Sequence, residues 1–415
     1  MDLHIRPILV ALRRHKAGTV LIALQIALTL AIVCNALFVI HQRLANISEP
    51  TGVDEADVFV IANQWADTGR SPAQMDAQVQ ADLLALRQLP AVRDATPASG
   101  YPLQGDTWDN FITMTPTQVQ PTTDAAVYTG DSHFINTLGL KLIAGRNFRP
   151  DEVMAAIGAQ QSITPPVVIV SKALADRLFP DGDALGKSFY AMGATPSTII
   201  GIVAPLHREG VDQWSNTYAG QSLIWPMRED GGGFYIVRAK PGQLAEAMRE
   251  APKALLAQSR MRIFDAHNGV PGIADYATIR RVAFASDRGL AILMGVICVV
   301  LLAITAAGIV GLTSFWVGQQ RKQIGIRRAL GARQRDILAY FLTENFLISL
   351  AGVALGTVLA LLFNLWMMTR FEMDRMSMTY VGIGVLLLLL LGQAATFAPA
   401  LRASRVPPIE ATRSV

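Results

Sequence analysis

The stretch WVGQQRKQIGIRRALGARQR, residues 316–335, carries six basic side chains and no acidic one. These are Arg321, Lys322, Arg327, Arg328, Arg333 and Arg335. Two of the most apolar segments of the chain flank it, and a short, strongly basic loop between two membrane spans stays in the cytosol. Ile324, Ile326, Leu330 and Ile337 recur at roughly helical spacing, which predicts a short amphipathic helix with an apolar ridge.

Two interpretations of this basic helix remain open. It is either a handle for a cytosolic partner, or a topology signal whose arginines only contact lipid phosphates. In the first case a groove on the partner would bind the ridge, and Gly325 and Gly331 would permit close approach of the two backbones.

The composition places part of the chain in lipid. Of its 415 residues 51% are hydrophobic, and its mean hydropathy is +0.34. Residues 41–287 contain 20 Lys and Arg against 26 Asp and Glu, so the net charge of +4 comes from the segments that bracket the spans. The basic residues do not collect on one soluble domain and are not interleaved with aromatic ones, which excludes nucleic acid as a partner.

Four long uncharged runs predict four membrane-spanning helices, with basic flanks that hold both termini in the cytoplasm. The predicted order is a cytoplasmic N-terminus (1–16), a first span (17–40), an extracytoplasmic domain (41–287), a second span with a stalk (288–318), a cytoplasmic coupling segment (319–336), a third span (337–369), a short periplasmic loop (370–378), a fourth span (379–401) and a cytoplasmic tail (402–415).

The large polar region is predicted to be an α+β domain inserted between the first and second spans. Expected strands lie at residues 57–61, 166–170, 198–203, 222–225 and 234–238. Expected helices lie at residues 72–89, with an apolar face of Met75, Val79, Leu83 and Leu86, at 171–179, capped by Ser171, and at 243–258.

No catalytic or metal-binding pattern emerges. Residues 182–188, GDALGKS, resemble a phosphate-binding loop but have three residues between the glycines where that loop needs four. The six histidines are scattered singly, and Cys34 and Cys298 both fall inside apolar runs. The chain is therefore not expected to be an enzyme or to bind a cofactor.

Glu344 lies early in the third span, where a carboxylate is costly unless it is interfacial or paired. We expect an ion pair with Arg327 or Arg328 that ties the basic helix to this span.

The ordered set of motifs resembles the permeases of the MacB/FtsX superfamily of ABC transporters over nearly the whole chain. Residues 321–332, RKQIGIRRALGA, are similar to the segment that follows the second span in that family. Residues 167–187 with 199–203 resemble the core of its periplasmic domain. Residues 341–345 and 399–413 resemble the start of its third span and its C-terminal end.

This resemblance implies a permease that works as a dimer and passes the closure of a cytosolic ATPase to the periplasm. The residues expected to dock on the ATPase are Arg321, Gln323, Ile324, Gly325, Ile326, Arg327, Arg328, Leu330 and Gly331. ATP and Mg would bind to that ATPase, which is expected to be a separate chain because only 16 residues precede Ala17. Family members usually have Glu where this chain has Gln323, which leaves homodimer and heterodimer open.

Two functions remain at this point. One is a transport subunit in the inner membrane that expels a periplasmic substrate, with a membrane-fusion adaptor as a further partner. The other is an FtsX-like signalling subunit that regulates a periplasmic cell-wall hydrolase. The size of the inserted domain favours transport.

Overall fold

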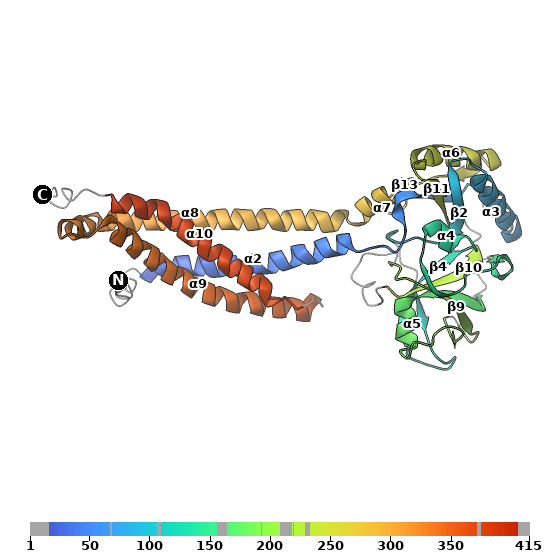
Figure 1. The fold of residues 1–415 in the computed structure, drawn as a ribbon, viewed down its shortest axis with the longest axis horizontal. Coiled ribbons are helices and arrows are strands. Elements are labelled where there is room, and N and C mark those ends of the chain that lie inside the picture. The colour runs from blue at the N-terminus through green and yellow to red at the C-terminus, as the bar shows by residue number, and fades with distance from the viewer. Residues whose placement is uncertain are drawn as a thin grey trace. The chain divides into compact units, whose positions relative to one another are not determined.

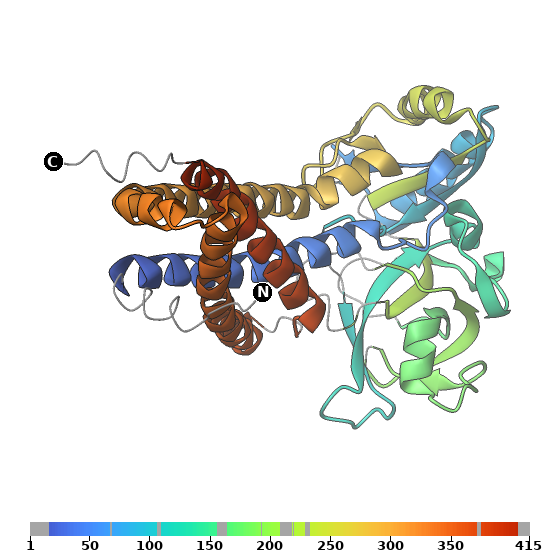
Figure 2. The same cartoon turned by 60° about the vertical axis from the view of Figure 1, so that its left-hand side comes forward.

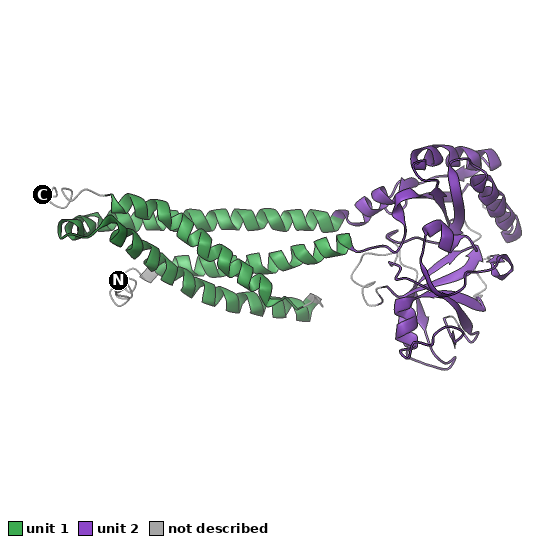
Figure 3. Cartoon of the chain, viewed as in Figure 1, with its two compact units in different colours: residues 1–48, 286–415 green, residues 49–285 purple. Residues whose placement is uncertain are grey.

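The computed structural model describes residues 16–66, 69–105, 109–155, 164–191, 193–207, 218, 220–228, 233–371 and 375–405. The chain divides into two compact units, residues 1–48 with 286–415 and residues 49–285 (Figure 3). Almost all of the predicted N-terminus, part of the loop predicted at 370–378 and most of the tail predicted at 402–415 lie outside the described residues.

The first unit, the membrane unit, contains four long helices (Figure 1). They are α2 (Lys16–Ser48), α8 (Ala285–Ala329), α9 (Gln334–Phe371) and α10 (Met378–Ser404). Each is long and apolar enough to cross a membrane. All four extend beyond the uncharged runs, because the Gln, Lys, Arg and Glu residues at the ends of those runs are good helix formers.

Helix α9 packs closely on α2 through Gly352 and Gly356. A Cβ atom at Gly352 would lie 2.8 Å from the carbonyl oxygen of Ala23, and one at Gly356 would lie 2.8 Å from that of Ala27. Small residues four apart let membrane helices approach in this way, and here they occur on both helices.

Two polar contacts join the helices within this apolar unit. Thr29 of α2 and Thr305 of α8 share a hydrogen bond of 2.8 Å between their hydroxyl oxygens. The Asn35 side-chain amide donates to the carbonyl oxygen of Ala360 on α9 at 3.2 Å. Such bonds persist in lipid because the bilayer core contains no water that could bond to the polar groups in their place.

The second unit, the inserted domain, is a mixed sheet with helices. Its strands are β1 (Val58–Trp65), β2 (Val92–Ala98), β3 (Asp109–Ile112), β4 (Thr123–Gly130), β5 (Leu142–Gly145), β6 (Met154–Ala155), β7 (Val167–Ser171), β8 (Ser188–Phe189), β9 (Ser197–Val203), β10 (Ser222–Arg228), β11 (Gly233–Ala239), β12 (Arg262–Ile263) and β13 (Ile273–Asp275). Its helices are α3 (Pro72–Arg87), α4 (Phe134–Leu138), α5 (Lys172–Leu178), α6 (Leu244–Gln258) and α7 (Tyr276–Ala283), with 3-10 turns η1 (Glu55–Asp57) and η2 (Pro150–Glu152).

The sheet has two halves that meet at one narrow place. The strand order is β12-β1-β11-β2-β4-β10-β7-β9-β5, and the ladder between β2 and β4 consists of the Ala98–Gly130 pair. Figure 2 shows the strands and helices of this unit from a second direction. One hydrophobic core, around Leu83 of α3, belongs to the half that ends in β2. A separate core, around Trp225 of β10, belongs to the half that begins at β4. The half with α3 and the half with β10 are named the α3 lobe and the β10 lobe below.

The predicted helix at residues 72–89 is confirmed as α3. Its first turn is held by a capping box, in which the Ser71 hydroxyl accepts from the Gln74 backbone and the Gln74 side chain accepts from the Ser71 backbone. The predicted apolar face is buried as expected: Met75, Val79, Leu83 and Leu86. The strands predicted within β1, β7, β9, β10 and β11 and the helices predicted at α5 and α6 are also confirmed.

An ion pair that the sequence pattern did not reveal lies beneath α3. Both carboxylate oxygens of Asp82 accept from Arg262, at 2.8 and 2.9 Å, and neither side chain is exposed. The Tyr235 hydroxyl donates to the same carboxylate at 2.7 Å. Burial and the negative charge of Asp82 raise the pKa of Tyr235 well above its ordinary value, so the phenol keeps the proton that it donates.

Candidate coupling site

The basic stretch does not form the separate short helix that its pattern predicted. Helix α8 continues without a break from the apolar span through the basic residues to Ala329 (Figure 1). No proline interrupts it, and its Gln, Lys, Arg and Ala residues favour helix in the polar part as well. The candidate coupling residues are therefore the last turns of the same 45-residue helix that contains the second span.

Gly331 ends this helix. Its φ of +99° lies in the region that favours glycine, its N–H donates to the carbonyl of Arg328, and the N–H of Ala332 donates to the carbonyl of Arg327. This pair of bonds is the Schellman motif. The role of Gly331 is thus to stop α8 and let the chain turn into α9, which begins at Gln334.

The predicted apolar ridge is split between two opposite faces of α8. Ile324 is 4% exposed, whereas Ile326 is 46% and Leu330 83% exposed. Successive helical residues are separated by about 100°, so Ile326 and Leu330 lie about 40° apart, while Ile324 lies about 160° from Ile326 and about 120° from Leu330. The prediction of one continuous ridge was wrong for this geometric reason.

The buried face holds the end of α8 to two other helices. Ile324 packs in a cluster with Ile337 and Phe341 of α9 and with Ala400 and Ala403 of α10. Gly325 is buried as well. Because three helices meet there, the end of α8 cannot shift without displacing α9 and α10.

The exposed face combines charge with two apolar side chains. Arg321, Lys322 and Gln323 are exposed, in addition to Ile326 and Leu330. Such a surface of two apolar side chains one helical turn apart, surrounded by cations, suits a groove with an acidic rim on a partner protein.

Glu344 does not form the predicted ion pair. Among the residues that the structure describes, no ion pair joins its carboxylate to Arg327 or Arg328. The Arg327 guanidinium instead lies 5.3 Å from the centre of the Tyr340 ring, a cation–π contact to the residue one turn before Glu344. Glu344 itself is 5% exposed and still feels the charge of Arg327. The link from α8 to α9 thus passes through Tyr340 as well as through Ile324.

The segment that resembled a phosphate-binding loop closes on itself. The Lys187 ammonium forms an ion pair with Asp183 at 2.5 Å and lies 5.1 Å from the centre of the Phe179 ring. These contacts hold the lysine within its own turn. Among the described residues, no three His, Cys, Asp or Glu side chains gather in a group that could hold a metal.

Four apolar helices that carry a mixed-sheet domain between the first and second define a multi-pass membrane protein. The MacB-like periplasmic core domain family matches residues 19–255, and the FtsX-like permease C-terminal family matches residues 295–408. The first match alone covers more than half of the chain. The chain therefore belongs to the MacB/FtsX-like family of ABC transporter permeases, which places it in the bacterial inner membrane, with the inserted domain as its periplasmic domain.

Relatives in other bacteria agree with this assignment. The chain is 28% identical over 339 residues to the macrolide export ATP-binding/permease protein MacB of Chromobacterium violaceum, covering 77% of this chain and 49% of that protein. It is 24% identical to an uncharacterized ABC transporter permease, YvrN, of Bacillus subtilis, covering 69% of each. The crystal structure of the periplasmic region of MacB from Actinobacillus actinomycetemcomitans is 18% identical, with a TM-score of 0.34, covering 57% of this chain and 96% of that one. The chain spans about half the length of the ATP-binding/permease relatives it matches.

Proposed function

We propose that this chain is the permease subunit of a MacB-type ABC transporter that turns ATP hydrolysis on a separate cytosolic ATPase into a conformational change of the periplasmic domain. ATP and Mg bind to the ATPase, and this chain contributes the docking surface and the membrane helices. The change serves efflux of a periplasmic substrate. The basic end of α8 and the short tail lie in the cytoplasm in this arrangement.

The single observation that carries the proposal is that the end of α8 has one exposed face and one buried face. Ile326 and Leu330 are exposed on one face, and Ile324 is buried against α9 and α10 on the other. A partner that displaces the exposed face therefore moves three of the four described membrane helices, one of which is joined directly by the chain to the periplasmic domain. If the basic stretch only set the membrane topology, it would need its basic side chains but not an exposed apolar pair.

Paired truncation tests the docking surface. Replacing Ile326 and Leu330 together by Ala should weaken docking by about 1–3 kcal/mol, because anchors at a protein interface carry most of its free energy. The measurement is co-purification with a co-expressed candidate ABC ATPase from the same genome, together with the ATP hydrolysis rate of the complex. The matched control is Ile292→Ala with Val296→Ala, an exposed pair at the same spacing on the same helix.

The control pair should co-purify as the unchanged chain does. Equal co-purification and hydrolysis for the Ile326/Leu330 pair, with normal membrane insertion, would refute the coupling assignment. Replacement of Arg327 and Arg328 by Gln separates the contribution of charge from that of the apolar pair.

A second permease chain completes the functional unit, and Gln323 favours a different chain in that place. The side chain is exposed on α8 and is neutral where family members usually carry Glu. An interface between two different subunits tolerates the loss of one charge on one side. The chain should therefore co-purify with an adjacent permease paralogue at equal stoichiometry by native mass spectrometry, whereas a stable ATPase complex containing only this permease would establish the homodimer.

The identity of the partner proteins distinguishes efflux from signalling. A relative named for macrolide export and the large inserted domain support efflux. An efflux subunit should work with a membrane-fusion adaptor, whereas an FtsX-like signalling subunit should work with a cell-wall hydrolase. Neighbouring genes for an ATPase and an adaptor support the first, and neighbouring genes for an ATPase and a hydrolase would overturn it.

A further inference from the structure

A cleft of about 480 Å³ lies where the α3 lobe and the β10 lobe of the periplasmic domain meet. The β2–β4 ladder beside it is short: among the described residues it consists of the Ala98–Gly130 pair, flanked by two bonds between Ser99 and Thr129, of 3.0 and 3.1 Å. Cavities of roughly 300–1,000 Å³ hold small molecules in proteins. The volume is therefore sufficient for a ligand of that size.

Part of the cleft lining is apolar. Helix α3 contributes Leu83 and Leu84, and the segment around η2 contributes Pro150 and Val153. Leu84 is 59% exposed, although the neighbouring Leu83 is only 2% exposed. An apolar side chain left open at the mouth of a cleft contributes free energy only when an apolar ligand covers it.

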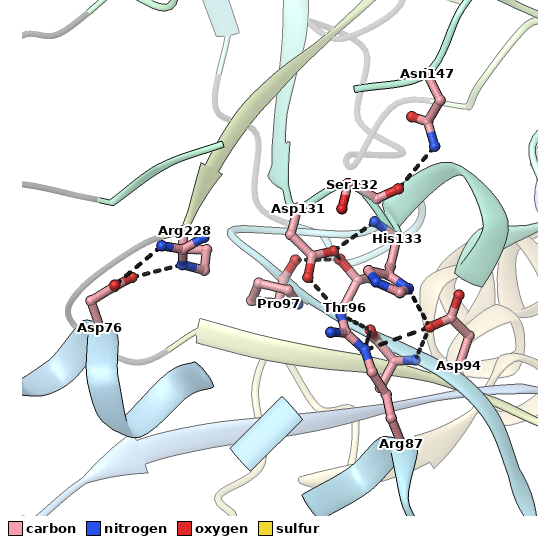
Figure 4. Close-up of polar contacts among 11 residues, drawn as sticks. Asp76, Arg87, Asp94, Thr96, Pro97, Asp131, Ser132, His133, Asn147 and Arg228 are labelled. Carbon is pink, nitrogen blue, oxygen red and sulfur yellow. Dashed lines mark hydrogen bonds and ion pairs between the residues drawn. The ribbon is translucent and has the colours of Figure 1, made fainter. Parts of the chain in front are cut away.

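The rest of the lining is polar, and the carboxylates of Asp131 in the lining and of Asp76 behind Arg228 already have partners (Figure 4). Asp131 accepts from Arg87 at 2.6 Å, from the Thr96 hydroxyl at 2.8 Å and from the backbone N–H of His133 at 2.9 Å. Asp76 accepts from Arg228 at 2.7 and 3.1 Å. Burial alone would raise the pKa of Asp76, but its bonds with Arg228 lower it overall, so this carboxylate stays ionised and paired.

Two arginines that line the cleft keep unused hydrogen-bond donors. The bonds of Arg87 use its Nε and Nη2 atoms, and those of Arg228 use the same two atoms. Among the described residues no acceptor lies on Nη1 of either guanidinium, and both residues line the cleft. A ligand that satisfies them must bring an acceptor, and an anionic acceptor makes the strongest bond to a guanidinium.

We propose that this cleft binds an amphiphile with an anionic head and an apolar chain. The head lies toward Arg87 and Arg228, and the chain lies along Leu84, Pro150 and Val153. The source of such a molecule is either a free alkyl acid or an anionic membrane lipid, and both have the same chemistry. The two ion pairs also cross between the lobes, from Arg87 to Asp131 and from Asp76 to Arg228, so a bound ligand would bridge the same junction. This inference concerns binding alone and is independent of coupling to an ATPase.

Photo-crosslinking on the full chain in phosphatidylcholine nanodiscs tests the proposal. The probe is a decanoate that carries a diazirine at the end of its chain, and the crosslinked peptides are identified by mass spectrometry. Labels should appear on residues 72–87 or 150–153. The variant Leu84→Asp should bind the probe at least about tenfold more weakly, because it removes apolar surface and adds a like charge.

The matched control is Leu256→Asp, the same change at an exposed leucine of α6 in the same lobe, which should leave labelling unchanged. A cationic probe of equal chain length should not label the cleft. Competition identifies the source: dihexanoyl phosphatidylglycerol displacing the probe better than decanoate indicates a lipid, and the reverse indicates a free acid. Equal labelling of both variants, labelling by the cationic probe, or competition by neither anion would overturn the proposal.

Discussion

At the scale of single residues, Asp82 and Arg262 form a fully buried ion pair in the periplasmic domain. Arg262 also lies 4.4 Å from the centre of the Trp65 ring. The pair links α3 to β12, which are far apart in sequence. Once both charges are buried, each depends on the other for compensation.

Removal of one partner should therefore be far more damaging than the loss of a surface pair. Asp82→Ala leaves the Arg262 charge buried and uncompensated, and we expect the domain to lose about 3–5 kcal/mol of its free energy of unfolding. The control is Asp176→Ala, which breaks the exposed pair with Lys172 and should cost about 1 kcal/mol or less. Denaturant unfolding of the purified chain gives both values. Similar losses in the two variants would show that Arg262 finds another partner or reaches water.

At the scale of helices and strands, much of the architecture was predictable from periodicity and charge. The four spans, the face of α3 and the cap at Ser171 follow from local rules that act within a few residues. The prediction of a single ridge on the basic stretch was wrong because Ile324 and Ile326 were assigned to one face, although their positions on the helix lie about 160° apart. The Asp82 pair and the cleft could not be predicted, because their residues come from distant segments that only the sheet brings together.

The approach of α2 and α9 leads to a prediction about glycine. Gly352→Ala would place a Cβ atom 2.8 Å from a backbone oxygen that cannot move aside, so the helices must separate. We expect a cost of about 1–3 kcal/mol, the usual range for overpacking a core. The measurement is the melting temperature of the purified chain in detergent.

Gly382→Ala on α10 serves as the control, because a Cβ atom there meets nothing within 4 Å. It should be neutral or stabilising by up to about 1 kcal/mol, since Ala has the better helix propensity. If the Gly352→Ala protein has the same melting temperature as the Gly382→Ala control, then α2 and α9 are not packed this closely.

At the scale of the whole molecule, the segregation of charge determines an orientation that labelling can measure. In a chain whose Cys34 and Cys298 are replaced, Asp183→Cys should react with an impermeant thiol reagent from outside the cell. Gln334→Cys, also exposed, should react only after the membrane is opened. The opposite pattern would invert the topology. Asp131 is unsuitable as a labelling site, because it is 6% exposed and holds Arg87.

The unbroken course of α8 also limits how the length of this helix can vary. Each residue added between Ala285 and Ala329 would rotate everything beyond it by about 100° and advance it by about 1.5 Å. A single insertion would thus turn Ile326 and Leu330 away from their present direction, whereas seven residues would restore it to within about 20°. The number of residues in α8 thus sets the direction in which its exposed face points. Homologues that differ in the length of α8 should therefore differ in steps of about seven or eleven residues.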